Sequence, residues 1–184
     1  MYIGLDLAFG GTGFCILHSR NDIIRDSGDF SAPKSVGLGP ARLGWFRDRI
    51  KFILNRYDIK GACVEGYSFG SNSGKAFTIG ELGGVVRLLL SDLEIPTIIM
   101  PPSNVKQFAT SSGTSKKDQM MLAVYKKWNE EFKSDNECDA YVLARMARAF
   151  YFRDGSLTEY QRKVMKKASV LIPKKPTPRV RSRK

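Results

Sequence analysis

The spacing of apolar residues changes once along this chain, near Pro40, and this change constrains the fold more than any other feature. Before it, the chain reads as three strands, at residues 2–7, 13–18 and 22–30. The first two form a hairpin that turns through Gly10, Gly11 and Gly13. After Pro40, helical and strand-like segments alternate. A β-meander that leads into alternating helices and strands implies an α/β sheet flanked by helices.

The second part of the chain begins with an amphipathic helix, in which apolar residues from Leu43 to Tyr57 recur at helical spacing. The later elements are expected as strands at 61–65 and 96–100 and as helices at 73–92, near 103–109, and at about 116–131 and 136–152. The pair Gly83-Gly84 lies inside the helix 73–92. Because glycine in a helix interior costs about 1 kcal/mol relative to alanine, we expect the pair to serve close packing.

The bulk composition excludes several classes of protein. A chain of 184 residues with 42% hydrophobic side chains suits one domain with its own core. No apolar run approaches the roughly 18 residues that span a membrane, and the first residues lack the basic segment of a signal peptide. Cys15, Cys63 and Cys138 are odd in number and widely spaced, so we expect buried thiols in a reducing cytoplasm, without disulfides or a zinc site.

The net charge of +12 is concentrated at the end of the chain. Residues 160–184 hold ten of the 30 Lys and Arg side chains and none of the 18 acidic ones, so the rest of the chain is nearly neutral. A basic arm of this kind suits a polyanion, most simply nucleic acid. A solubilising or weakly membrane-attracted tail is the alternative. Three prolines between 173 and 178 predict flexibility in the last dozen residues.

Three carboxylates stand where chemistry could use them. Asp6 interrupts an apolar strand, Glu65 ends the strand 61–65, and Asp139 lies near the start of the helix 136–152. An ionised carboxylate costs several kcal/mol to bury unless it is paired or bound to a metal. If the two strands are neighbours and the helix crosses them, the three acids converge. Oxygen-only clusters suit Mg²⁺ or Mn²⁺, and two such ions can hydrolyse a phosphodiester.

Structural readings of the same residues compete with this one. Asp6 could cap the turn that follows it. Asp135, Asn136 and Glu137 could be a helix N-cap and first-turn acids, which the spacing alone favours. His18 is the only histidine and is expected at a strand end without a catalytic task, which leaves no serine triad.

Four segments in order resemble the motifs of the RuvC family of Holliday junction resolvases. They are IGLDLAFGGTGFCIL, VEGYSFGSNSGKAFTIGELGGVVR, PPSNVKQFATSSGTSKKDQM and DNECDAYVLARMA, within residues 2 to about 152. The resemblance implies a ribonuclease-H-like fold with a mixed five-stranded sheet flanked by helices. It also implies a Mg²⁺-dependent crossover junction endodeoxyribonuclease, with Mn²⁺ able to substitute. The helix of the second motif would help to form a homodimer.

By this resemblance Asp6, Glu65 and Asp139 are metal ligands and catalytic residues. The family usually places a fourth ligand, Asp or His, three residues before the last acid. Asn136 stands there in this chain, and Asp135 is a possible substitute. Lys117 would lie close to the scissile phosphate. The residues expected to contact DNA are Tyr67, Phe69, Lys75, Lys106, Lys116 and Lys117. The family's stacking aromatic usually lies three residues after the Glu, where this chain has Ser68, so the resemblance leaves Tyr67 and Phe69 both open.

The main hypothesis is a homodimer in the bacterial or phage-infected cytoplasm that nicks four-way DNA junctions symmetrically. The chain would divide into a nuclease domain, 1–155, and a basic, partly flexible extension, 156–184. One rival is a broader nuclease for flaps, forks and other branched DNA. A second is a junction-binding protein with weak catalysis, which the uncharged Asn136 keeps open. A third, an actin-like ATPase, would need a second glycine-rich phosphate loop, and the loop around Gly113 is poor in glycine.

Overall fold

The computed structural model describes residues 1–67, 73–152 and 156–171, without the side chains of 73–76. Its centre is a mixed sheet with the strand order β3-β2-β1-β4-β5-β6. The strands are β1 Tyr2–Asp6, β2 Thr12–Leu17, β3 Ile24–Phe30, β4 Gly61–Glu65, β5 Thr97–Met100 and β6 Ser169–Leu171. The first three form the expected antiparallel meander, and β4 and β5 continue from β1 in parallel. The expected α/β architecture is confirmed.

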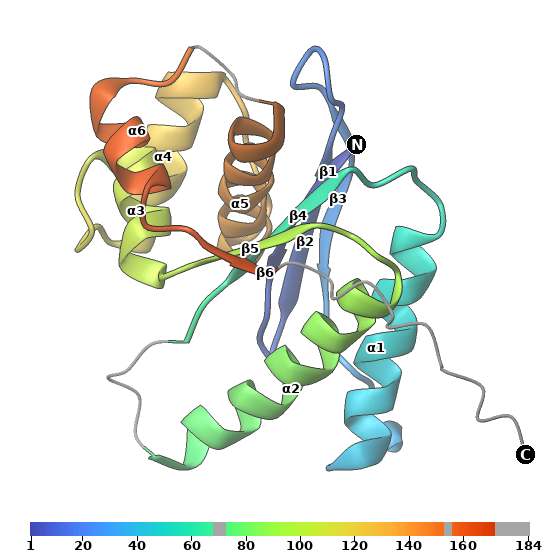
Figure 1. The fold of residues 1–184 in the computed structure, drawn as a ribbon. Helices are drawn as coiled ribbons and strands as arrows, with labels where there is room; N and C mark the ends of the chain where they lie inside the picture. The colour runs from blue at the N-terminus through green and yellow to red at the C-terminus, as the bar shows by residue number, and fades with distance from the viewer. Residues whose placement is uncertain (68–72, 153–155, 172–184) are drawn as a thin grey trace, which may run out of the picture.

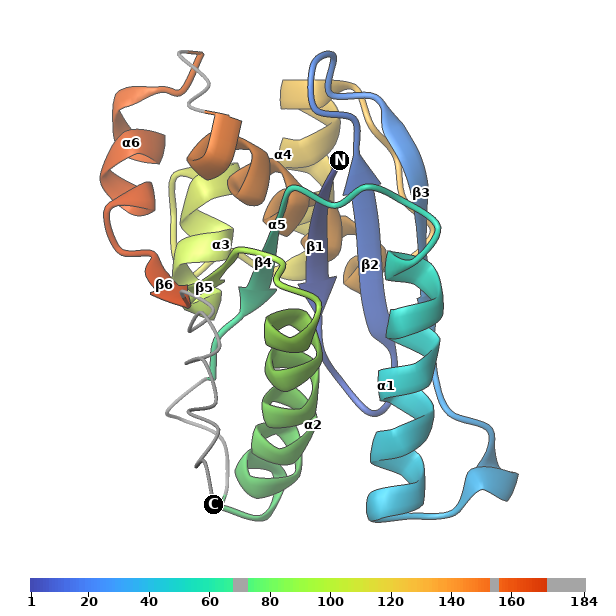
Figure 2. The ribbon, with the colours of Figure 1, turned by 45° about the vertical axis from the view of Figure 1, so that its right-hand side comes forward.

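Helices cover both faces of this sheet (Figure 1). The helices are α1 Pro40–Leu54, α2 Ser73–Asp92, α3 Pro102–Thr110, α4 Lys117–Trp128, α5 Asp135–Phe152 and α6 Glu159–Met165, besides a short 3₁₀ turn at Lys34–Val36. Figure 2 shows α1 and α2 side by side on one face and α5 on the other. Alternation along β1 explains the two cores. Ile3 and Leu5 pack towards α1 and α2, whereas Tyr2 packs towards α5.

The prediction of five strands was wrong, because residues 169–171 add β6 antiparallel to the edge strand β5. The start of the basic extension is also folded. In α6, Val164 joins the core on the α5 side, and the buried Gln161 donates to the Phe108 carbonyl at 3.2 Å. Four basic residues between 162 and 167 mask this short apolar pattern in the sequence. The predicted flexible last dozen residues lie outside the described part of the chain, and the domain boundary near 155 stays a prediction.

Two further features of the described chain bear on the composition. All three cysteines are buried. No helix in the described ranges is long and apolar enough to cross a membrane.

The helix α5 lies directly on β1 and β2 because glycines face it. A Cβ on Gly4 would stand 2.0 Å from the Ala140 carbonyl oxygen, and a Cβ on Gly13 would stand 2.0 Å from that of Asn136. Small residues on the helix, Ala140 and Ala144, complete the close approach. This packing places the first turns of α5 over the end of β1 at which Asp6 lies.

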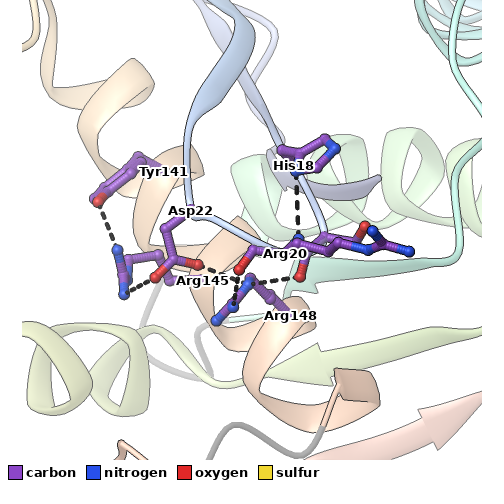
Figure 3. A network of polar contacts seen from close by, with 7 residues as sticks. His18, Arg20, Asp22, Tyr141, Arg145 and Arg148 are labelled. Carbon is purple, nitrogen blue, oxygen red and sulfur yellow. Dashed lines mark hydrogen bonds and ion pairs between the residues drawn. The ribbon is translucent and has the colours of Figure 1, made fainter.

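The far half of α5 is held by a polar network at the turn between β2 and β3 (Figure 3). Asp22, in the left-handed conformation at φ 57°, pairs with Arg145 at 2.9 Å and with Arg148 at 2.6 Å. Arg145 also donates to the Tyr141 hydroxyl at 3.0 Å. His18 follows β2, where its Nδ1 accepts from the Arg20 backbone at 3.3 Å. Because β2 runs antiparallel to β1, this network lies at the end of the sheet away from Asp6.

We predict that Asp22→Ala lowers the free energy of unfolding by about 2 kcal/mol, because two nearly buried guanidinium groups lose their counter-charge. Asp22 itself is 31% exposed, so the loss stays below that of a fully buried pair. Urea unfolding measures it, with Asp22→Asn separating charge from shape. Asp48→Ala, which breaks the exposed pair with Arg47, is the control and should change little. Equal stability of both alanine variants would contradict the prediction.

Candidate metal centre and nucleic-acid interface

The structure brings the three predicted carboxylates together at one end of the sheet. Asp6 ends β1 and Glu65 ends β4, and the parallel register that pairs Leu5 with Val64 sets the two acids side by side. Asp139 lies in the second turn of α5, which crosses above them. Asp6 is 9% exposed and shares a side-chain hydrogen bond with Glu65. In the following turn, the Thr12 hydroxyl donates to the Ala8 carbonyl at 2.9 Å.

Burial and mutual repulsion raise the pKa of all three acids. Burial is the main cause of the raised pKa of Asp6, and the hydrogen bond from Glu65 opposes it. For Glu65 the nearby charges of Asp6 and Asp139 add to burial and raise its pKa further. Burial and then Asp6 raise the pKa of Asp139 to about 6. Without a cation, therefore, burial and mutual repulsion favour protonation of the Asp6–Glu65 pair over its doubly ionised form.

Two predicted lysines face this cluster. Lys106 on α3 lowers the pKa of Glu65 and of Asp139, and Lys117 at the start of α4 lowers the pKa of Asp6 and of Asp139. The two cations offset only part of the repulsion, because the pKa of each acid stays raised. An additional cation at this site would therefore be electrostatically favourable.

The donor set fits a hard divalent cation, since all three side chains offer carboxylate oxygens and all three are destabilised as bare anions. In the described ranges, no three Asp, Glu, His or Cys side chains are already arranged around a common ion position. The carboxylates would therefore have to turn towards an ion as it replaces their proton.

We predict that the metal-free protein loses stability as pH rises from about 5 to about 9. The three acids keep their protons to higher pH in the folded state than in the unfolded state, where they titrate near 4. The folded state therefore binds more protons in this window, and the free energy of unfolding falls with pH. Thermal unfolding in EDTA measures the slope. Glu65→Gln should flatten it, and a slope unchanged by Glu65→Gln would contradict the assignment.

The residues at the start of α5 were expected to cap the helix or to be acids of its first turn, and the structure separates these two roles. Ser134 is the helix cap, because its hydroxyl accepts from the Glu137 backbone at 3.2 Å, so the N-cap role considered for Asp135 and Asn136 was wrong. Asp135 and Glu137 are first-turn acids, as expected. Asp135 is ion-paired with Lys117, and Glu137 accepts from Ser27 at 2.6 Å.

The fourth-ligand position lies against the hairpin turn after β1. The Nδ2 of Asn136 is 2.6 Å from the point where a Gly11 Cβ would stand, so a side chain at Gly11 would displace the amide. Since Asp135 already has a partner in Lys117, Asn136 is the freer of the two candidates to approach an ion.

The other predicted DNA contacts are only partly described. Lys116 is exposed at the start of α4, beside a hollow of ≈ 620 Å³ that also has Ser112, Thr114 and Gln119 in its lining. Tyr67 is 38% exposed and lies against α2. Phe69 and the side chain of Lys75 lie outside the described residues.

Sequence reasoning missed one cation beside the site. Arg42 on α1 donates to the Phe9 carbonyl at 3.0 Å and lies over the Phe9 ring, so it holds the turn after Asp6 from the other face of the sheet. In the sequence Arg42 is one of several arginines on the polar side of a helix, and nothing local distinguishes it.

Comparison with known proteins places this geometry in context. The family model described as crossover junction endodeoxyribonuclease RuvC matches residues 3–146. The RuvC of Dictyoglomus thermophilum is 28% identical over 145 residues, covering 77% of this chain and 91% of that protein. The RuvC of Ehrlichia canis is 26% identical over 148 residues, covering 80% and 95%. The family match ends within α5, so α6 and β6 lie beyond it.

Solved structures agree on the fold. Thermus thermophilus RuvC in complex with a Holliday junction substrate is similar at a TM-score of 0.69 and 19% identity, covering 85% of this chain and 97% of that one. The yeast mitochondrial Holliday junction resolvase Ydc2 is similar at a TM-score of 0.56 and 14% identity, covering 90% and 80%. The expected ribonuclease-H-like fold is confirmed.

Proposed function

The chain belongs to the RuvC family of crossover junction endodeoxyribonucleases, and from this premise we propose that it resolves Holliday junctions by metal-dependent phosphodiester hydrolysis, with Mg²⁺ as its cofactor. One observation carries the proposal. Three carboxylates from β1, β4 and α5, of which Asp6 is buried and the other two partly buried, meet at one end of the sheet, with Lys106 and Lys117 facing them. We also expect the protein in the cytoplasm, where such DNA lies.

In this proposal Asp6, Glu65 and Asp139 hold the metal, and Asn136 adds a neutral oxygen. When bound, divalent ions would supply an activated water and charge stabilisation at the leaving oxygen. Lys117, at the start of α4, is a fixed cation that stabilises charge developing on the phosphate. Its partner Asp135 holds the ammonium at the cluster before DNA arrives. Because the pKa of Glu65 and of Asp6 is raised, a bound cation would favour the ionised form of both carboxyls.

Several basic residues are proposed to bind the DNA arms. Lys106 and Lys117 adjoin the acids, and Lys116 continues the positive surface with the hydroxyls of Ser112 and Thr114. Lys75, Phe69 and the basic residues of the extension remain proposed contacts from the sequence. Because α6 and β6 are packed parts of the fold, a test of the tail should remove only residues 172–184, which contain six Lys and Arg.

Symmetric cutting of two strands requires two sites, and α2 offers a surface for a second copy. Phe77 is 75% exposed and Leu88 is 63% exposed, and Gly84 lies between them on the same side of the helix with open space at its Cβ position. Large apolar side chains aligned in this way mark an interaction surface. We propose that the homodimer forms through this face.

We predict that Leu88→Arg converts the dimer to a monomer, because two guanidinium groups would be buried without partners at a symmetric contact. Analytical ultracentrifugation at micromolar concentration measures the change. Phe52→Arg, at a similarly exposed apolar position on α1, should remain dimeric. Dimers of unchanged stability in Leu88→Arg would place the interface elsewhere.

The proposed function is tested with a labelled four-way junction beside a matched linear duplex, in Mg²⁺, in Mn²⁺ and in EDTA. Paired nicks on the junction alone, dependent on metal, are expected. Equal cutting of flaps and forks would support the broader nuclease. Tight junction binding without product in either metal would support a binding protein, for which the uncharged Asn136 is the specific reason. In that case the Asn136→Asp variant is expected to restore cleavage.

A further inference from the structure

Tyr67, two residues after Glu65, is fastened to one side of α2. Its hydroxyl donates to the Gly80 carbonyl at 3.1 Å. The guanidinium of Arg87 lies over its ring, 4.3 Å from the centroid. Gly83 leaves the room for the ring, because a Cβ there would stand 2.6 Å from the hydroxyl oxygen and 3.0 Å from Cε1. Positions 80, 83 and 87 share one side of a helix, so the three contacts form a single seat.

The seat is specific to an aromatic ring. The Nε of Arg87 is buried without a hydrogen-bond partner in the described ranges, and the guanidinium lies over the ring face. A cation over an aromatic face stabilises the contact by about 0.5–2 kcal/mol, more as the pair is desolvated. A DNA base that stacked on the ring face covered by Arg87 would have to displace the guanidinium.

The backbone between Glu65 and Tyr67 is also held. The Gly66 amide donates to the Met100 carbonyl at 2.7 Å, which continues the pairing of β4 with β5 beyond the strand end. Glu65 is therefore followed by one anchor on β5 and by a second on α2. These two contacts tie the residues directly after Glu65 to both β5 and α2.

We propose that Tyr67 is a positioning residue that fixes the Glu65 loop against α2, and that it is not the aromatic that stacks at the branch point. The proposal rests on the proposed function, since it assigns Glu65 to the reaction. Of the two aromatics that the sequence left open, Tyr67 has a structural task, and Phe69 lies outside the described residues. Gly83, one of the paired helix glycines, is the residue that makes this task possible.

The test uses Gly83→Ala, Arg87→Met and Tyr67→Leu in the full chain, with Tyr67→Phe as the conservative variant. Gly44→Ala is the matched control, because Gly44 also lies inside a helix and its Cβ position is open. Single-turnover cleavage of a four-way junction in Mg²⁺ should fall about tenfold in the first three variants, as misplaced catalytic groups do. Junction affinity in EDTA should stay within about twofold, and Tyr67→Phe and Gly44→Ala should cut nearly as fast as wild type.

A base-stacking Tyr67 would behave differently. Gly83→Ala and Arg87→Met would then cut at the wild-type rate. With 2-aminopurine placed at the crossover, fluorescence should rise when a base unstacks on binding, and only Tyr67→Leu would lose this rise. That pattern would overturn the proposal. Hydrogen exchange of the segment 61–67 separates this failure from failure of the proposed function. The Gly66 amide should exchange faster in Gly83→Ala than in Gly44→Ala whether or not the wild type cuts DNA, and unchanged exchange would also overturn the proposal.

Discussion

Asp6→Asn is expected to lower junction cleavage in Mg²⁺ by on the order of 10³-fold or more, because it removes one anionic oxygen from the proposed metal centre. The same substitution should leave junction binding in EDTA unchanged. It should also raise the stability of the metal-free protein, since Asp6 is buried and its pKa is raised. Cleavage is measured by single-turnover kinetics and stability by thermal unfolding.

The combination of lost cutting and gained stability is what separates a metal ligand from a structural carboxylate. A turn-capping Asp6 would instead lose stability when its carboxylate is replaced. Asp48→Asn, an exposed acid on α1, is the control and should change neither quantity. Wild-type cleavage by a folded Asp6→Asn protein would remove Asp6 from the metal centre and with it the proposed mechanism.

Gly4→Ala is expected to lower the free energy of unfolding by about 3 kcal/mol or more, although it adds a single methyl group. The Cβ would stand 2.0 Å from the Ala140 carbonyl oxygen and 2.3 Å from the Ala144 amide nitrogen. Both are backbone atoms of α5, so no side chain can turn away and the helix must move off β1. Any folded fraction should also cut junctions poorly, because the displaced helix carries Asp139.

Gly28→Ala provides the comparison, since it makes the same change in another strand of the sheet. Its Cβ would meet only the edge of the Phe14 ring at 3.3 Å, which a small ring movement relieves. Urea unfolding should therefore show little loss for Gly28→Ala and a large loss for Gly4→Ala. Similar losses in both would mean that strand propensity, not the contact with α5, sets the effect.

Local sequence patterns predicted most of the helices and strands. The boundaries of β1 to β5 and of α1 to α5 follow from apolar periodicity and turn residues, which depend on near neighbours alone. The isolated position of Asp6 in an apolar strand likewise marked it as unusual, since a buried charge needs a partner wherever the strand lies. The elements that were missed, α6 and β6, are short, lie in a basic part of the sequence and are stabilised by contacts with distant segments.

What the sequence by itself determined was the order of the elements and the three acids that stand at their ends. Only the tertiary structure decided which of these side chains touch. The parallel register of β1 and β4 sets Asp6 beside Glu65. Lys117 forms an ion pair with Asp135, and Tyr67 is hydrogen-bonded to α2. Each contact joins residues that are many positions apart. It depends on how strands and helices pack in three dimensions, which hydrophobic periodicity does not encode.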